Sequence, residues 1–285
     1  MRRTIMQEFI NLTLDEERAL YGIKNAKVVD CSFSGVADGE SALKECRNLL
    51  VENCFFDLRY PLWHLEKGTI NNSKMTENCR AALWYDKFIE IYDSTLSGIK
   101  ALRECRNVLL SGNSINSLEF GWFCHHLKIS NCTLISQYPF MKSQKMEITN
   151  LEMRAKYSFQ YVKNVTIKNS NLDTKDAFWH SENVRVENSV IKGEYLGWYS
   201  KNLHLINCKI TGTQPLCYAK GLVLENCEME NCDLSFEKSD VNAQICGSID
   251  SIKNPQQGMI KAQSINQIIF DETCKNKDKC KIIFD

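Results

Sequence analysis

Hydrophobic residues recur along this chain at a fixed spacing. When the sequence is aligned on the pattern hydrophobic–x–Asn–x–x–hydrophobic, the Asn or Asp position falls every 19 residues, seven times running, from Asp93 to Asn226. Apolar residues stand four and two positions before this anchor and three after it, and the step of two is typical of a strand with one buried face. The anchors are Asp30, Asn53, Asn72, Asp93, Gly112, Asn131, Asn150, Asn169, Asn188, Asn207 and Asn226.

A repeat of this length restricts the fold class. A unit of 19 residues is too short for a propeller blade of about 40 residues and lacks leucine-rich-repeat spacing. A parallel β-helix remains, and we expect the right-handed form because parallel crossovers are overwhelmingly right-handed. A weak six-residue rhythm would suit a left-handed β-helix, but the small residues expected at matching offsets are missing. The sequence predicts an all-β, single-stranded right-handed parallel β-helix with about twelve coils.

The anchor residues have a structural explanation. In a β-helix they would stack at about 4.8 Å, the ordinary spacing of strands. Asn and Asp suit such corners because they tolerate the left-handed backbone conformation. A second ladder of the same chemistry lies five positions before the first, at Asn25, Asn48, Asn107, Asn164, Asn183 and Asn202.

The ends of the chain interrupt the repeat. We predict one β-helix domain over residues 1–285, with an N-terminal cap at 1–16, regular coils at 17–246, and a last coil with a cap and tail at 247–285. An open β-helix must protect its terminal strands from pairing with other chains. The tail combines a basic cluster with three apolar residues, so we expect it to dock on the solenoid or to mediate self-association.

Charge and composition exclude some partners and locations. Thirty-five basic residues balance thirty-five acidic ones, so no overall field favours nucleic acid or an anionic membrane. No apolar run approaches the roughly 18–20 residues that span a bilayer, and the N-terminus lacks the apolar segment of a signal peptide. We therefore predict a cytoplasmic protein.

The fourteen cysteines are then expected to be reduced thiols, since disulfide frameworks belong to exported chains. They alternate with Ser, Ala or Asn in two columns, which indicates small buried residues. The spacings Cys227/Cys232 and Cys274/Cys280 lack the second pair that a structural zinc site needs. We predict no metal and no cofactor.

All five tryptophans occupy one column, nine positions before the anchor: Trp63, Trp84, Trp122, Trp179 and Trp198. The preceding column is apolar and is expected to form core, so the tryptophan column would point outward. The following column, which includes His64 and Tyr85, is too polar for a core. An aromatic strip of this kind suits stacking on sugar rings or contact with a protein partner. The competing interpretation is a ladder of side chains that only stiffens one face.

A duplicated phrase, "ALKEC" and "ALREC", places Lys44 and Arg103 in the tryptophan column, on either side of Trp63 and Trp84. They would lie three coils apart, about 14 Å, which matches the reach of a short oligosaccharide. We predict that this N-terminal half of the strip binds the ligand. The alternative is simple duplication, with Lys–Glu and Arg–Glu pairs at a solvated surface. The predicted ligand-binding residues are Lys44, Trp63, His64, Trp84, Tyr85, Arg103, Glu104 and Trp122.

Three functions are compatible with these features. The first is carbohydrate recognition by the strip, and the second is a non-catalytic scaffold that binds protein through the same surface. The third is a polysaccharide lyase or hydrolase with a site near Glu40, Lys44, Arg59 and Arg103. Hydrolysis of a glycoside needs two carboxylates about 5 Å or about 6.5–9.5 Å apart, and no repeated acidic column supplies such a pair.

Five segments carry a resemblance to a known family: "ERALYG" (17–22), "GESALKECRN" (39–48), "RYPLWH" (59–64), "LWYDK" (83–87) and "GSIDSIKNP" (247–255). The chain resembles a bacterial family of unknown function, number 3737, over about residues 5–272. That family belongs with the pectin-lyase-like right-handed β-helices, so the resemblance implies the same fold. It implies no accepted activity and no catalytic residues.

Overall fold

The computed structural model describes residues 6–275 and 277–284. The chain divides into two compact units, Met1–Phe140 and Met141–Asp285, called unit 1 and unit 2 below and described separately. Strands dominate both units, and the described residues contain no helix that is long and apolar enough to cross a membrane.

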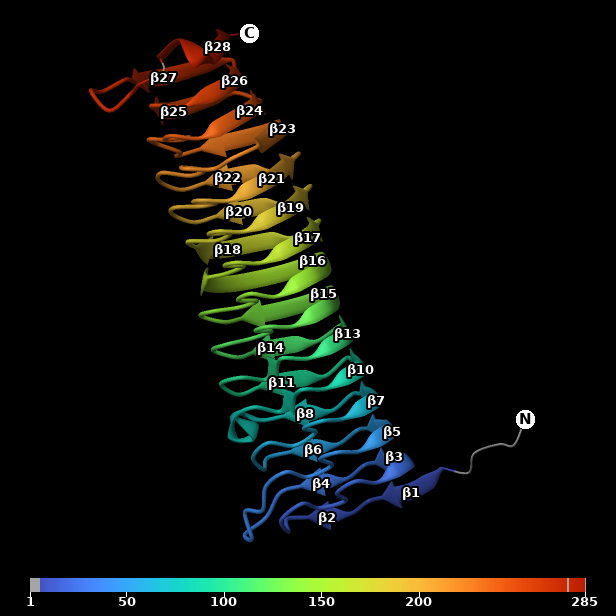
Figure 1. Cartoon of the computed structure of the whole chain (residues 1–285). Helices are drawn as coiled ribbons and strands as arrows, with labels where there is room; N and C mark the ends of the chain where they lie inside the picture. Colours follow the sequence, from blue (N-terminus) through green and yellow to red (C-terminus); the bar gives the residue numbers. More distant parts are fainter. Residues whose placement is uncertain (1–5, 276, 285) are drawn as a thin grey trace. The chain divides into compact units, whose positions relative to one another are not determined.

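Unit 1 is a stack of coils in which each strand pairs in parallel with the strand one coil away (Figure 1). The long strands are β1 (Gln7–Ile10), β3 (Lys24–Val29), β5 (Arg47–Glu52), β7 (Glu66–Asn71), β10 (Lys87–Tyr92), β13 (Arg106–Ser111) and β15 (His125–Ile135). A second ladder consists of β2 (Thr13–Leu14), β4 (Ser32–Phe33), β6 (Phe55–Phe56), β8 (Lys74–Met75), β11 (Thr95–Ser97) and β14 (Ser114–Asn116). A third, short ladder joins β9 (Leu83–Trp84) to β12 (Leu102–Arg103). One 3-10 turn, η1 (Glu77–Cys79), interrupts the coils.

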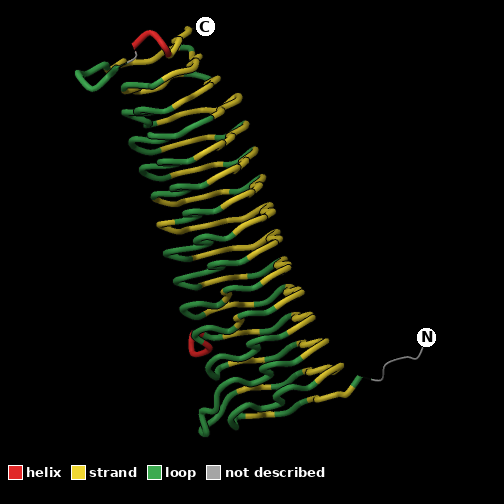
Figure 2. The backbone as a smooth tube through the Cα atoms, in the orientation of Figure 1, coloured by secondary structure: helices red, strands yellow, loops and turns green. Residues whose placement is uncertain are grey.

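Unit 2 repeats this plan. Its long strands are β16 (Gln144–Tyr157), β17 (Lys163–Lys168), β19 (Glu182–Glu187), β21 (Lys201–Ile206), β23 (Leu222–Glu230), β24 (Asp240–Ile245), β26 (Gln257–Ala262) and β28 (Cys280–Phe284). The second ladder holds β18 (Asn171–Lys175), β20 (Val190–Lys192) and β22 (Lys209–Thr211), and β25 (Ser248–Lys253) pairs with β27 (Ser264–Ile269). A 3-10 turn, η2 (Lys277–Lys279), precedes β28. Within each unit, strands stack on strands and loops on loops (Figure 2).

The predicted all-β, right-handed parallel β-helix is confirmed. The coil count is higher than the predicted twelve, since the described residues contain seven long strands in unit 1 and eight in unit 2. The extra coils lie where we expected caps. At the N-terminal end, β1 and β2 pair in parallel with β3 and β4 and so make a coil. At the other end, β26 and β28 continue the ladder.

Residues 1–5 of the predicted N-terminal cap, and Asn276 and Asp285 of the predicted C-terminal cap and tail, lie outside the described residues. The single domain predicted for residues 1–285 stays a prediction.

The core of each unit is built from the columns predicted to point inward. Position four before the anchor and position two before it are buried in coil after coil, for example Val184 and Val186 in β19. The column before the tryptophans is also buried and stacks large side chains. Phe159 and Phe178 in unit 2 lie 5.1 Å apart with nearly parallel rings. Burial of these apolar columns is the main source of stability.

The first predicted ladder exists as a hydrogen-bonded row, and the second exists in part, for example where Asn202 donates to Asn183 at 2.9 Å. In unit 2 the Asn188 amide donates to Asn169 at 3.4 Å and accepts from Asn207 at 3.0 Å. In unit 1 Asn53 donates to Asp30 at 3.0 Å. The anchors adopt the left-handed conformation, with φ of 49° at Asn188. This confirms the prediction that Asn and Asp stand at corners whose backbone conformation they tolerate.

Replacing Asn188 with alanine is expected to lower the free energy of unfolding by about 2–4 kcal/mol. The change removes two side-chain hydrogen bonds, which contribute about 0.5–1.5 kcal/mol each, and replaces a residue that tolerates the left-handed region with one that tolerates it poorly. Asn188→Gly keeps the backbone freedom and removes only the amide, so it should cost less. Urea titration of the three proteins measures both effects, and an Asn188→Ala protein as stable as the parent would contradict the ladder's contribution.

Candidate ligand-binding strip

The tryptophan column lies at a corner where the backbone repeatedly enters the left-handed region. Leu62 and His64, on either side of Trp63, both have φ of 58°. This backbone buries Leu62 completely and leaves Trp63 half-buried on the outer side. Trp84 and Trp122 are also half-buried, each after a buried residue. The strip of unit 1, defined as Lys44, Trp63, Trp84, Arg103 and Trp122 with the column that follows it, therefore borders solvent.

The indole N–H groups fix the orientation of the rings. Trp63 Nε1 donates to the carbonyl of Ala81 at 2.6 Å, and Trp122 donates to the carbonyl of Tyr138. Trp84 Nε1 reaches the Glu104 carboxylate at 3.3 Å. Each indole thus also links neighbouring coils. This is the structural role that was the alternative interpretation to ligand binding. The exposed part of each ring keeps a fixed position.

Both predicted cations contact the tryptophans. The Lys44 ammonium lies 5.7 Å from the Trp63 ring centre. The Arg103 guanidinium lies 5.1 Å from the Trp84 ring and 5.0 Å from the Trp122 ring, so it is sandwiched between them. These distances are typical of cation–π contacts. The row Lys44–Trp63–Trp84–Arg103–Trp122 brings together the residues that the duplicated phrase pointed to.

Carboxylates accompany the Arg103 end of the row. Arg103 pairs with Glu104 at 3.5 Å and with Glu119 at 3.2 Å. At the other end, Glu45 accepts a hydrogen bond from the Tyr21 hydroxyl at 2.5 Å. This hydrogen bond is the largest cause of the raised pKa of Tyr21. The predicted Arg–Glu pair therefore forms, whereas Lys44 contacts an indole and Glu45 a tyrosine.

The column that follows the tryptophans adds a second aromatic row. His64 and Tyr85 are exposed and stack at 5.1 Å with an interplanar angle of 21°. Glu104 and the exposed Phe123 continue this row. All eight predicted site residues of the N-terminal half therefore lie on neighbouring columns of one surface of unit 1.

Asp86, which lies beneath this surface, was not among the predicted site residues. Its side chain is completely buried, accepts a hydrogen bond from the Leu65 N–H at 2.8 Å, and leaves its Oδ2 without a partner among the described residues. Burial raises the pKa of Asp86 well above its ordinary value, and Cys105 adds to the rise. The sequence did contain a sign of this residue, because Asp86 is an acidic residue in a column otherwise filled with Cys, Ser and apolar residues. Glu119 and Phe123 were also missed, because only the coil geometry brings them to Arg103.

The strip of unit 2 has a different ring arrangement. Trp179 and Trp198 stack face to face at 5.5 Å with an angle of 3°. Their indole N–H groups donate to the carbonyls of Tyr195 and Gln214 at 2.7 and 2.8 Å. The following column forms a ladder of parallel rings about one strand spacing apart: Tyr161, His180, Tyr199 and Tyr218. Stacking covers the ring faces and leaves mainly edges exposed.

Of the four residues proposed for an enzyme site, two contact each other. Arg59 pairs with Glu40 at 3.4 Å and with Asp38 at 2.7 Å. The hydrogen bond to Asp38 is the main cause of the raised pKa of Arg59. Lys44 and Arg103 contact indoles instead. The structure thus joins only Glu40 and Arg59 of the four.

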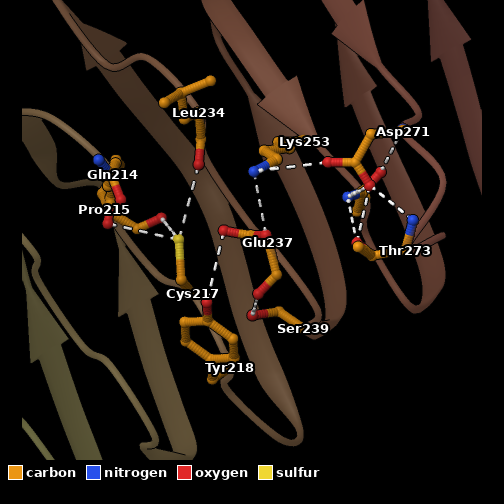
Figure 3. A network of polar contacts seen from close by, with 11 residues as sticks. Gln214, Pro215, Cys217, Tyr218, Leu234, Glu237, Ser239, Lys253, Asp271 and Thr273 are labelled. Carbon is orange, nitrogen blue, oxygen red and sulfur yellow. Dashed lines mark hydrogen bonds and ion pairs between the residues drawn. The ribbon is translucent and has the colours of Figure 1, made fainter.

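A second polar network, in unit 2, was not foreseen (Figure 3). Lys253 bridges Glu237 at 3.2 Å and Asp271 at 3.6 Å, and Tyr218 reaches Glu237 at 3.5 Å. Asp271 also accepts hydrogen bonds from Thr273, and these lower the pKa of Asp271 to about 2. Because the Asp271 carboxylate stays ionised and is occupied by these contacts, it cannot exchange a proton near neutral pH. We therefore interpret this network as a structural link between the last coils.

The cysteines behave as the column pattern predicted. All fourteen are free, and twelve are buried. Burial raises the pKa of Cys54 to about 11 and of Cys217 to about 12, so these thiols are poor nucleophiles. Among residues 6–275 and 277–284, no group of three or more His, Cys, Asp or Glu side chains could hold a metal ion.

Comparison with solved structures gives distant fold likenesses. The tailspike protein of E. coli bacteriophage HK620, solved with a hexasaccharide, aligns with a TM-score of 0.48 and 8% identity over 91% of this chain. The chain spans 61% of that tailspike. PfbA, a surface adhesin of Streptococcus pneumoniae, aligns with a TM-score of 0.36 and 14% identity, over 84% of this chain and 68% of its own. DFA-IIIase from Arthrobacter chlorophenolicus A6 aligns with a TM-score of 0.32 and 10% identity, over 90% of this chain and 74% of its own.

No curated protein matches the sequence. A family match, by contrast, extends over residues 7–283, almost the entire chain. The match agrees with the resemblance found in the five segments. The chain belongs to the family described as "Protein of unknown function (DUF3737)".

Proposed function

We propose that this protein is a cytoplasmic carbohydrate-binding β-helix that holds its ligand on the strip of unit 1. The single observation that supports this proposal most is the row Lys44–Trp63–Trp84–Arg103–Trp122, in which half-buried indoles contact two cations. Indoles can pack against the C–H faces of sugar rings, and cations and carboxylates can bind hydroxyl or acidic groups at their edges.

The row is fixed before a ligand arrives. The hydrogen bonds of the Trp63 and Trp122 indoles to backbone carbonyls, and the sandwiched position of Arg103, limit the freedom of these side chains. Fixed side chains lose little conformational entropy on binding. Glu104 stands beside Trp84 and offers an acceptor for ligand hydroxyls.

Ring geometry favours the unit 1 half of the tryptophan column. Trp63 and Trp84 meet edge to face at 64°, whereas Trp179 and Trp198 are parallel at 3°. Parallel stacking uses a face of each ring for its neighbour, and an edge-to-face pair does so for one ring only. We therefore assign ligand binding to Trp63, Trp84 and their neighbours.

A glycan array of neutral and acidic oligosaccharides tests the function. We expect binding to at least one oligosaccharide class, followed by a change in tryptophan fluorescence when that ligand is titrated in solution. A protein that binds no glycan, but captures a protein partner through the same surface, would support the scaffold hypothesis and overturn this proposal.

A further inference from the structure

The first coil of unit 1 leaves part of its core uncovered. The residues of this coil that stand in inward-pointing columns are only partly buried: Phe9, Leu14 and Leu20. One coil further on, the same columns hold residues that are completely buried: Val28, Phe33 and Leu43. Apolar core surface left in contact with water is stabilised when another surface covers it.

The last coil of unit 2 is open in the same way. Ile282 in β28 and Ile265 in β27 are only partly buried. They stand in register with Ile260 and Ile249, which are both completely buried. Phe284, at the end of β28, is 53% exposed. The inward-pointing columns therefore end in exposed apolar side chains in the first coil and in the last.

Each of these two coils also ends in an open strand edge. Among the described strands, β1 pairs only with β3 and β28 only with β26. The outer edges of β1 and β28 thus keep backbone N–H and C=O groups without a strand partner, and such an edge is a template for pairing with another chain. Both pairings are parallel, so β28 has the edge to which a following coil adds and β1 the edge to which a preceding coil adds. The two edges therefore fit each other as successive coils do.

The columns determine the register in which these edges can meet. Ile282 continues the column of Ile260, and Phe9 begins the column that Val28 continues. Both belong to the inward-pointing column two positions before the anchor. A pairing that keeps this column continuous sets Ile282 opposite Phe9, because a slip by one residue would turn every side chain of the strand to the other face.

This register also matches the side chains on the outer face. It sets Lys281 opposite Glu8 and Ile283 opposite Ile10, which is 47% exposed. Glu8 already pairs with Lys27 of the next coil at 3.4 Å, so Lys281 would extend a row of alternating charges. Opposite charges and apolar neighbours across two strands stabilise their pairing. The complementary charge and apolar columns identify the partner of each edge as a second copy of this chain.

We propose that copies of this protein associate head to tail, with β28 of one copy paired in parallel with β1 of the next. The contact covers Phe9 of one copy with Ile282 of the other and satisfies the open backbone edges of both strands. Each copy has one edge of each kind, so a pair of copies can add a third. The contact uses no residue of the strip of unit 1 and does not depend on the proposed carbohydrate binding.

Sedimentation velocity of the full chain over a concentration series tests the proposal. We expect the weight-average mass to rise with concentration. Ile10→Lys blocks the β1 edge and Ile283→Lys blocks the β28 edge, because each sets a charge against an apolar residue in the contact. We expect each variant alone to associate about tenfold more weakly than the parent, or weaker still.

A mixture of the two variants gives the sharpest result. Each variant has the intact edge that the other lacks, so an equimolar mixture should form dimers that do not grow further. Formation of these dimers also shows that both variants are folded. Ile99→Lys is the matched control, since Ile99 is 50% exposed in a turn between β11 and β12. It should associate like the parent.

Four outcomes would overturn the proposal. A parent protein that stays monomeric at every concentration would mean that the two end coils are covered in another way, by the chain itself or by a different protein. Strong association of either edge variant alone, a monomeric mixture, or loss of association in Ile99→Lys would contradict the head-to-tail contact. Trp84→Ala should associate like the parent, so failure of this contact and failure of the proposed glycan site can be told apart.

Discussion

Replacing Phe178 with alanine is expected to lower the free energy of unfolding by about 3–5 kcal/mol, the usual cost of emptying a buried phenylalanine site. Phe178 is completely buried and stacks on Phe159 at 5.1 Å. A coil contacts the coils above and below it, so the cavity would weaken two interfaces at once.

The control is Tyr199→Ala in the outer ladder of the same unit. Tyr199 is 42% exposed and stacks on His180 and Tyr218, so its removal should cost only about 1 kcal/mol. Urea titration followed by circular dichroism compares the two. Equal losses would contradict the assignment of the phenylalanine column to the core and of the tyrosine column to the surface.

Replacing Asp86 with serine is expected to stabilise the protein by about 1–3 kcal/mol at pH 8, since the change removes a buried polar group with an unpartnered oxygen. Among the serines of this column, Ser239 pairs its hydroxyl, whereas the hydroxyls of Ser181 and Ser200 have no partner among the described residues, and we expect the introduced serine to follow Ser239. The Ser239 hydroxyl accepts from the Ala219 N–H at 2.9 Å and donates to the Leu216 carbonyl at 2.7 Å. The introduced hydroxyl would accept from the Leu65 N–H, which now donates to Asp86 at 2.8 Å.

The gain should depend on pH with a defined sign. Burial raises the folded-state pKa of Asp86 well above its ordinary value, and the unfolded value is about 3.9. As pH rises above about 4, the unfolded chain loses the proton first, so the parent protein loses stability until pH passes the folded pKa. Below pH 4 both states are protonated and this difference vanishes.

Thermal melts of the parent and the Asp86→Ser variant between pH 4 and pH 8 measure this dependence. We expect the difference in melting temperature to grow with pH. A gain independent of pH, or a variant less stable than the parent at pH 8, would show that the Asp86 carboxylate is accommodated without cost.

The repeat allowed most of the fold to be predicted, because each coil presents the same small set of positions. The prediction was wrong at the ends of the chain, where coils stand in place of the expected caps. Asn11 lies 19 residues before Asp30 and shares its left-handed conformation, so the first coil was within reach of the period. Near the other end, β23 and β24 shift register between Leu224 and Cys227, which breaks the spacing on which the alignment relied.

The site was only partly predictable. Column position showed that the tryptophans point outward, but not how the rings turn. Trp84 and Trp198 share a column and a similar backbone. Trp84 nevertheless meets Trp63 edge to face, whereas Trp198 stacks face to face on Trp179.

The most direct test of the account is glycan affinity measured in parallel on Trp84→Ala and Trp198→Ala, with tryptophan fluorescence or calorimetry and the best ligand from the array. Removal of an aromatic anchor from a binding surface costs about 2 kcal/mol or more, so we predict a loss of at least tenfold for Trp84→Ala and little change for Trp198→Ala. Equal losses, or a loss from Trp198→Ala alone, would contradict the placement of the site on unit 1.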